Sequence, residues 1–141
     1  MPKILVIDDS SMDRKIVSMI IKKNMATYEI IEADSFEAAK PYLDDTALEL
    51  VITDLNMPDI TGFTVIEFIR KNEKTSTLPI LVISGTKESE SKNICQELGA
   101  NVFLKKPLSP PLLMECLDYL LAKTNVESQE AVQAIFSKTG R

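Results

Sequence analysis

Four apolar runs and one shorter mixed segment recur along the chain, and each is soon followed by polar residues or a turn. They are Lys3–Ile7, Tyr28–Glu32, Leu50–Thr53, 79–83 and 102–104. Continuous apolar runs of this length are typical of strands that are buried on both faces of a sheet. The pattern therefore predicts five short, mostly buried strands.

The segment after the first run has apolar residues at helical spacing. Ser10 or Ser11 is predicted to cap this helix, and the basic stretch 22–24 is predicted to end it. Its core-facing stripe is predicted to be Met12, Ile16, Met19 and Ile20.

The second helix carries two conflicting signals. Asp34 and Glu37 have the spacing of a capping box, with Asp34 as the cap. Pro41 lies inside the same segment and is expected to kink or shorten the helix, because proline lacks the N–H that a helix interior needs.

Three further helices are predicted downstream. One runs from Phe63 to near Asn72, and the next is a mostly polar segment, 87–99, that Gly99 ends. The apolar anchors of that polar helix are predicted to be Ile94, Cys95 and Leu98. The last helix begins at Pro110–Pro111 and has the strongest apolar stripe of the chain, which consists of Leu113, Cys116, Leu117, Leu120 and Leu121.

Strands that alternate with helices predict an α/β protein with right-handed crossovers and a parallel sheet covered on both faces. We expect one domain over residues 1–123, followed by a tail over 124–141 for which a short extra helix, a dimer contact and the start of a linker are open alternatives.

Composition narrows the range of functions. A net charge of -5 argues against a nucleic-acid-binding surface, and no apolar run approaches the ~18 residues that a membrane span needs. Residues 1–7 lead straight into Asp8, so we expect no signal peptide. The absence of histidine excludes His-ligated zinc and His-based nucleophilic catalysis. Two distant cysteines are expected to be buried thiols in a reducing cytoplasm.

Polar residues of complementary chemistry follow four of the five runs. Asp8 and Asp9 follow the first, Asp54 the third, Ser84 the fourth, and Lys106 lies just beyond the fifth. Since the carboxyl ends of parallel strands meet at one edge of a sheet, these side chains are expected to share one crevice, where ligands bind in open α/β sheets.

This combination favours a hard cation and phosphate chemistry. Three carboxylates within about 5 Å repel one another by roughly 3 kcal/mol per pair at an effective dielectric near 20, so a cation is expected among them. Oxygen-only ligands select an ion such as Mg²⁺. A carboxylate can itself form an aspartyl-phosphate, which Lys106 and Ser84 would contact and Gly85 would leave room for. Taken singly, Asp54 could simply begin a turn.

The segments ILVIDDS, DLNMPDITG, ISGT and GANVFLKKP occur in this order between Met1 and Lys123. In these motifs the chain resembles the response-regulator receiver domain of two-component signalling, in its single-domain, chemotaxis-regulator form. The resemblance implies a flavodoxin-like fold with strand order 2-1-3-4-5. It also implies that Asp54 is the phosphoacceptor and that Lys106, not Lys105, is the family's lysine.

The same resemblance implies a metal site and a switch. Asp9 and Asp54 would bind Mg²⁺ through side chains, Asn56 through its backbone carbonyl and Asp8 through a water. Ser84 stands at the family's Thr or Ser position. Phe103 stands at the switch aromatic, often Tyr, and the alternative that it is simply a core residue of the fifth strand stays open.

Two departures are expected to matter. Gly85 replaces the more usual Ala and would loosen the loop, and Phe103 lacks the hydroxyl of Tyr.

The resemblance further implies a cytoplasmic, phosphorylation-controlled switch and not an enzyme. The donor would be a histidine kinase or a histidine phosphotransfer protein. A downstream protein, or a second copy of the chain, would bind the face formed by the fourth helix, fifth strand and fifth helix. Three alternatives stay open: a receiver cut from a longer regulator, a scaffold that does not use phosphate, and a phosphatase of the haloacid dehalogenase type. The last would need a second Asp where Ser10 stands.

Overall fold

The computed structural model describes residues 1–85 and 89–122. They form a five-stranded parallel sheet of order β2-β1-β3-β4-β5, which confirms the predicted fold class and strand order. The strands are β1 (Lys3–Ile7), β2 (Glu29–Ala33), β3 (Leu48–Asp54), β4 (Ile80–Ser84) and β5 (Val102–Lys105). The predicted tail over 124–141 lies outside the described residues.

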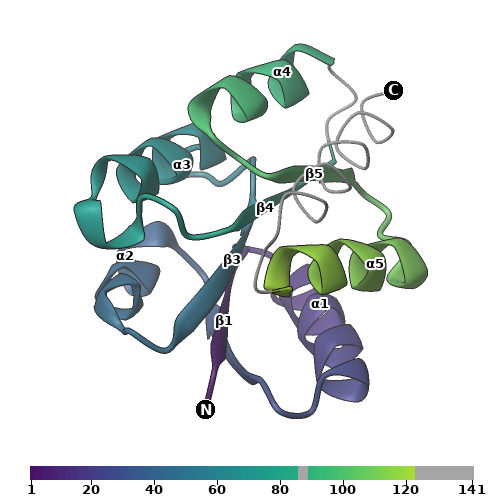
Figure 1. Cartoon of the computed structure of the whole chain (residues 1–141). Helices are drawn as coiled ribbons and strands as arrows, with labels where there is room; N and C mark the ends of the chain where they lie inside the picture. The colour runs from purple at the N-terminus through teal and green to yellow at the C-terminus, as the bar shows by residue number, and fades with distance from the viewer. Residues whose placement is uncertain (86–88, 123–141) are drawn as a thin grey trace.

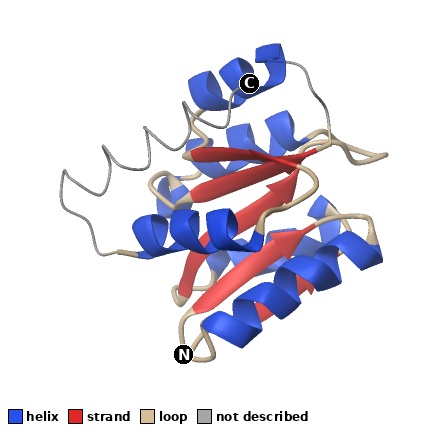
Figure 2. Cartoon of the chain, turned by 90° about the vertical axis from the view of Figure 1, so that its right-hand side faces the viewer, coloured by secondary structure: helices blue, strands red, loops and turns tan. Residues whose placement is uncertain are grey.

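Helices cover both faces of the sheet (Figures 1 and 2). On one face lie α1 (Ser11–Asn24) and α5 (Pro110–Leu121), and on the other α2 (Phe36–Ala39), α3 (Gly62–Lys71) and α4 (Ser89–Leu98). Short 3₁₀ segments, η1 (Lys40–Asp44) and η2 (Glu73–Thr75), follow α2 and α3. None of the helices in these described ranges is long and apolar enough to cross a membrane.

Alternation along β3 divides the core into two layers. Leu50 and Ile52 pack with α1 and α5, whereas Val51 packs with the helices of the opposite face. All three side chains are at most 1% exposed, as expected for a central parallel strand. The parallel registers bring the ends of β1, β3 and β4 to one edge, with Ile7 paired to Thr53 and Asp54 paired to Ile83.

The stripe predicted for α1 faces the core only at Ile20, which is half-buried against the layer of α1 and α5. Met12, Ile16 and Met19 are 71%, 44% and 69% exposed, and the helix instead buries Val17 and Ile21. Both sets have helical spacing, so periodicity alone could not distinguish them. The β-branched pair faces the sheet, and the longer apolar stripe is left on the surface.

The cap of α2 also differs from the prediction. The Ser35 hydroxyl, not Asp34, accepts the hydrogen bond from the Ala38 N–H, at 3.1 Å. Pro41 does shorten the helix as predicted, because the chain continues as η1 after Ala39.

The polar helix α4 is anchored by fewer residues than predicted. Cys95 is fully buried, but Ile94 is 40% exposed. Gly99 ends α4 as predicted, at a φ of 110° that side-chain-bearing residues rarely adopt.

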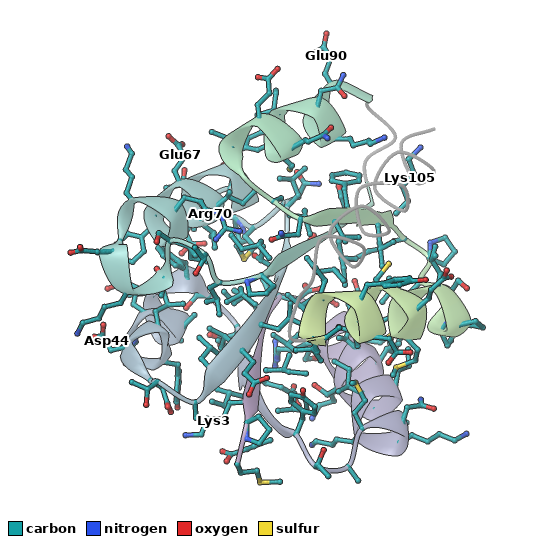
Figure 3. All side chains as sticks on the ribbon, viewed as in Figure 1. Lys3, Asp44, Glu67, Arg70, Glu90 and Lys105 are labelled. Atoms are coloured by element: carbon teal, nitrogen blue, oxygen red, sulfur yellow. The ribbon has the colours of Figure 1, made fainter. Side chains whose placement is uncertain are left out.

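Arg70 joins several elements at the edge of the sheet where the strands begin. Its guanidinium donates to the carbonyl oxygens of Leu78 at 2.6 Å and Gly99 at 3.0 Å, and to Asn101 Oδ1 at 3.0 Å. Asn101 Oδ1 also accepts from the Ile80 N–H. Figure 3 shows Arg70 directed into the molecule while Glu67, on the same helix, points outward. Burial lowers the pKa of Arg70, so the carbonyl oxygens around it serve to stabilise a desolvated charge.

Candidate functional site

The carboxyl ends of the strands gather the predicted acidic residues. One carboxylate oxygen each from Asp8, Asp9 and Asp54 lies within 4.8 Å of the others. Asp8 and Asp54 are 4% and 6% exposed, whereas Asp9 is exposed to solvent. The predicted crevice therefore exists, with two buried carboxylates and one at its opening.

This cluster suits a hard divalent cation. Its donors are carboxylate oxygens that already converge, and neither nitrogen nor sulfur ligands take part, which fits Mg²⁺. Asn56 follows in the β3–α3 loop, and its N–H donates to Asp54 Oδ1 at 3.4 Å. This hydrogen bond holds the backbone of Asn56 next to Asp54.

Asp54 has a strongly perturbed carboxyl group. Burial and the nearby charge of Asp8 raise its pKa from 3.8 to about 6, while Lys106 and the Asn56 N–H partly oppose the rise. Asp9 adds a smaller upward effect. The protein therefore stabilises the negative charge of ionised Asp54 only in part, and a bound cation would stabilise it further.

Lys106 is the ammonium of the site, as predicted, and Lys105 takes no part in the ion pairs. Lys106 Nζ lies 3.6 Å from Asp54 Oδ2 and 3.4 Å from Asp8 Oδ2. Its backbone N–H donates to the Ser84 carbonyl oxygen at 2.8 Å, which fixes the start of this loop to the end of β4. The Lys106–Pro107 peptide bond is cis.

A fourth carboxylate, Asp13, lies beside Lys106 and was not predicted from the sequence. Its Oδ2 lies 2.7 Å from Lys106 Nζ, closer than either cluster residue. Burial disfavours the charged lysine, but the hydrogen bond to Asp13 and the charges of Asp54 and Asp8 outweigh it, so the pKa of Lys106 is raised. An acid in the first turn of a helix is common, and nothing in its position 93 residues from Lys106 indicated this contact.

Arg14 is a second residue whose contact with the site was not predicted from the sequence. Its guanidinium donates to the Asp8 backbone carbonyl at 2.7 Å and to Glu32 at 3.1 Å. It therefore holds the end of β1, and with it the Asp8 backbone, against β2.

The remaining predicted residues surround the cluster in different ways. Ser84 ends β4 and is fully buried. Gly85 is exposed, and within the described residues a Cβ added there would meet no atom within 4 Å. Phe103 is 0% exposed in the core layer of α2, α3 and α4, so this structure has the switch candidate in an inward position.

A pocket of about 480 Å³ opens beside Lys106, between α1 and the β5–α5 loop. Asp8, Asp13 and Lys106 form its charged part. Its remaining walls come from Ile16, Val17, Ile83, Gly85, Pro107 and Leu108.

Comparisons with known proteins identify the family to which this fold belongs. Residues 4–118 match the family model of the response regulator receiver domain. The two-component response regulator ORR5 of Oryza sativa subsp. japonica is 31% identical over 110 residues, which cover 77% of this chain and 81% of that protein. The chemotaxis protein CheY of Pseudomonas aeruginosa is 27% identical over 123 residues, covering 87% and 98%.

A solved structure shows the same fold. The chemotaxis response regulator CheY4 of Vibrio cholerae superimposes with a TM-score of 0.76 at 30% identity, over 86% of this chain and 99% of that one.

Proposed function

We propose, because the chain belongs to the response regulator receiver domain family, that it is a signalling switch controlled by phosphorylation of Asp54. One observation carries the choice of residue. Asp54 is the buried carboxylate that ends the central strand β3, and it lies within reach of both the other acids and Lys106. Asp8 and Asp9 would serve the metal, while Asp54 would also accept the phosphoryl group.

Mg²⁺ is the cofactor of this proposal. Asp9 and Asp54 would hold it by their side chains, Asn56 by its carbonyl and Asp8 through a water. When bound, it would offset the charge of the carboxylates and of an incoming phosphoryl group.

The phosphoryl donor would be a phosphohistidine of a kinase or phosphotransfer protein, supplied in trans because this chain contains no histidine. An Asp54 carboxylate oxygen would form the new bond to phosphorus as the bond to the donor imidazole nitrogen breaks. The Lys106 ammonium, 3.6 Å from Asp54 Oδ2, would then contact a phosphoryl oxygen. Asp54 reacts as its ionised form, which a bound cation would favour because it offsets the burial and the charge of Asp8 that raise the pKa of this carboxyl group.

The output of the switch would be a change in the surface formed by α4, β5 and α5. In this proposal Ser84 approaches the phosphoryl group, and the packing around Phe103 adjusts. Because Phe103 is already buried, the adjustment would be a repacking within the core layer and would not require entry from solvent. A downstream protein or a second copy of the chain would respond to that surface.

The chain would act on no substrate other than its own acyl phosphate, so we propose a switch and not an enzyme. Cys95 and Cys116 are buried and unpaired, which supports the expected reducing, cytoplasmic setting. Whether the switch works alone or within a longer regulator does not alter the chemistry at Asp54.

The test is treatment with a small phosphodonor and Mg²⁺, followed by measurement of acid-labile phosphate. Wild type should be labelled and Asp54→Ala should not. Asp34→Ala is the matched control, because Asp34 is an exposed carboxylate that follows β2 at the same edge of the sheet. Equal labelling of wild type and Asp54→Ala would overturn the proposal.

A further inference from the structure

Lys106 makes its closest ion pair with a carboxylate outside the cluster of Asp8, Asp9 and Asp54. Its Nζ lies 2.7 Å from Asp13, compared with 3.4 Å from Asp8 and 3.6 Å from Asp54. The ammonium therefore makes its closest contact with α1, and it lies at longer and nearly equal distances from the two buried acids.

The usual role of an acid in the first helical turn does not account for this orientation. In a capping box, the acid three residues after the cap accepts a hydrogen bond from the backbone N–H of the cap. Here the Ser10 N–H donates to Asp8 Oδ1 at 2.9 Å instead. The Ser10 hydroxyl still accepts from the Asp13 N–H at 3.2 Å, so the cap holds the backbone of Asp13 while its carboxylate reaches Lys106.

An ammonium and a divalent cation compete for the same carboxylate oxygens. With Asp13 uncharged, Lys106 would keep only Asp8 and Asp54 as partners among the carboxylates that the structure pairs with it. It would then bind them more tightly and oppose a cation there.

We propose that Asp13 is a positioning residue that draws Lys106 away from Asp8 and Asp54, so that their oxygens remain available to a divalent cation. The proposal rests on the proposed function, because it assigns Mg²⁺ to this cluster and a phosphoryl contact to Lys106. Once Asp54 carries a phosphoryl group, the lysine exchanges Asp13 for a phosphoryl oxygen.

A different role for Asp13 would be simple attraction of the cation by one more negative charge. The two roles differ in their dependence on Lys106. Attraction by charge acts whether or not the lysine is present, whereas positioning acts only through it. A double-mutant cycle therefore separates them.

The experiment is calorimetric titration of Mg²⁺ into wild type, Asp13→Asn, Lys106→Met and the double variant. Asp13→Asn should weaken Mg²⁺ binding by about fivefold when Lys106 is present, the upper range for a partly exposed ion pair. In the Lys106→Met background the same change should alter affinity by less than about twofold. Asp13→Glu should retain the wild-type affinity, and Asp34→Asn controls for the loss of one carboxylate at this edge.

Equal weakening in both backgrounds, or no weakening with Lys106 present, would overturn the positioning role. A second readout is the rate of labelling by a small phosphodonor. Asp13→Asn should require more Mg²⁺ but approach the wild-type rate at saturation, and a large loss at saturating Mg²⁺ would also overturn the proposal. If wild type bound no Mg²⁺, the proposed function would fail first, and the positioning role would fall with it.

Discussion

Replacement of Asp54 by asparagine should stabilise the fold in the absence of metal, by an amount that depends on pH. Burial and Asp8 raise the pKa of Asp54 from 3.8 to about 6, so the folded protein binds this proton more tightly than the unfolded chain does. The stability of the wild type therefore falls as pH rises from about 4 to about 6. Asparagine keeps the size of the carboxyl group and does not titrate, so it avoids that loss.

The size of the effect follows from the two pKa values. One pKa unit corresponds to 1.36 kcal/mol, so a rise from 3.8 to about 6 corresponds to at most roughly 3 kcal/mol. Asp8 and Asp9 lie in the same cluster and can share the proton, which reduces the expected gain to about 1–3 kcal/mol above pH 6.

The assay is urea unfolding of both proteins in a chelating buffer between pH 4.5 and pH 7.5. The difference in unfolding free energy between Asp54→Asn and wild type should grow across this range and level off above pH 6. The exposed Asp34→Asn variant should show no such growth. A difference that stays constant with pH, or shrinks as pH rises, would refute the reasoning about the buried charge.

Four further substitutions test other parts of the structure by the same unfolding measurement, and Mg²⁺ binding is a second measurement for one of them. Arg70→Ala should lower the free energy of unfolding by about 3 kcal/mol, since several carbonyl groups lose a charged donor. A loss under about 1 kcal/mol would show that the Arg70 hydrogen bonds do not hold these elements together. Gly99→Ala should lower the free energy of unfolding by about 1–3 kcal/mol, because φ is 110° and a Cβ would lie 2.9 Å from Arg70 Nε. Gly85→Ala should be near neutral, because a Cβ there would meet no atom of the described residues within 4 Å. Equal losses for the two variants would argue against this explanation. Gly62→Ala should destabilise the fold and weaken Mg²⁺ binding, because a Cβ would lie 2.9 Å from the Asp54 carbonyl oxygen. Unchanged Mg²⁺ affinity would show that the β3–α3 loop adjusts without moving the Asp54 carboxylate.

The strand ends were predictable because two rules act together there. Buried parallel strands are continuous apolar runs, and the polar residues that follow them must meet at one edge. These rules predict that Asp8, Asp54 and Lys106 share one crevice, and the structure confirms that they lie together. The roles given to these residues remain proposals.

Helix faces and side-chain partners were harder to predict, for different physical reasons. On α1 two apolar stripes have helical spacing, and only packing against the sheet selects Val17 over Met12. At α2 two adjacent polar residues could cap, and local backbone geometry selects Ser35 over Asp34. The contact of Asp13 joins elements that are far apart in sequence, so no local pattern contains it.

The Arg70 hydrogen bonds restrict how α4 can be displaced. They tie the carbonyl of Gly99, at the carboxyl end of α4, to α3 and, through Asn101, to the start of β4. A motion of α4 that keeps these bonds is therefore expected to be smallest at that end. Ten residues of helix span roughly 15 Å, so a turn of about 10° would move the opposite end, at Ser89, by about 2.5 Å. The displacement of α4 would therefore be largest at Ser89, the end that follows Ser84 and the acidic crevice along the chain.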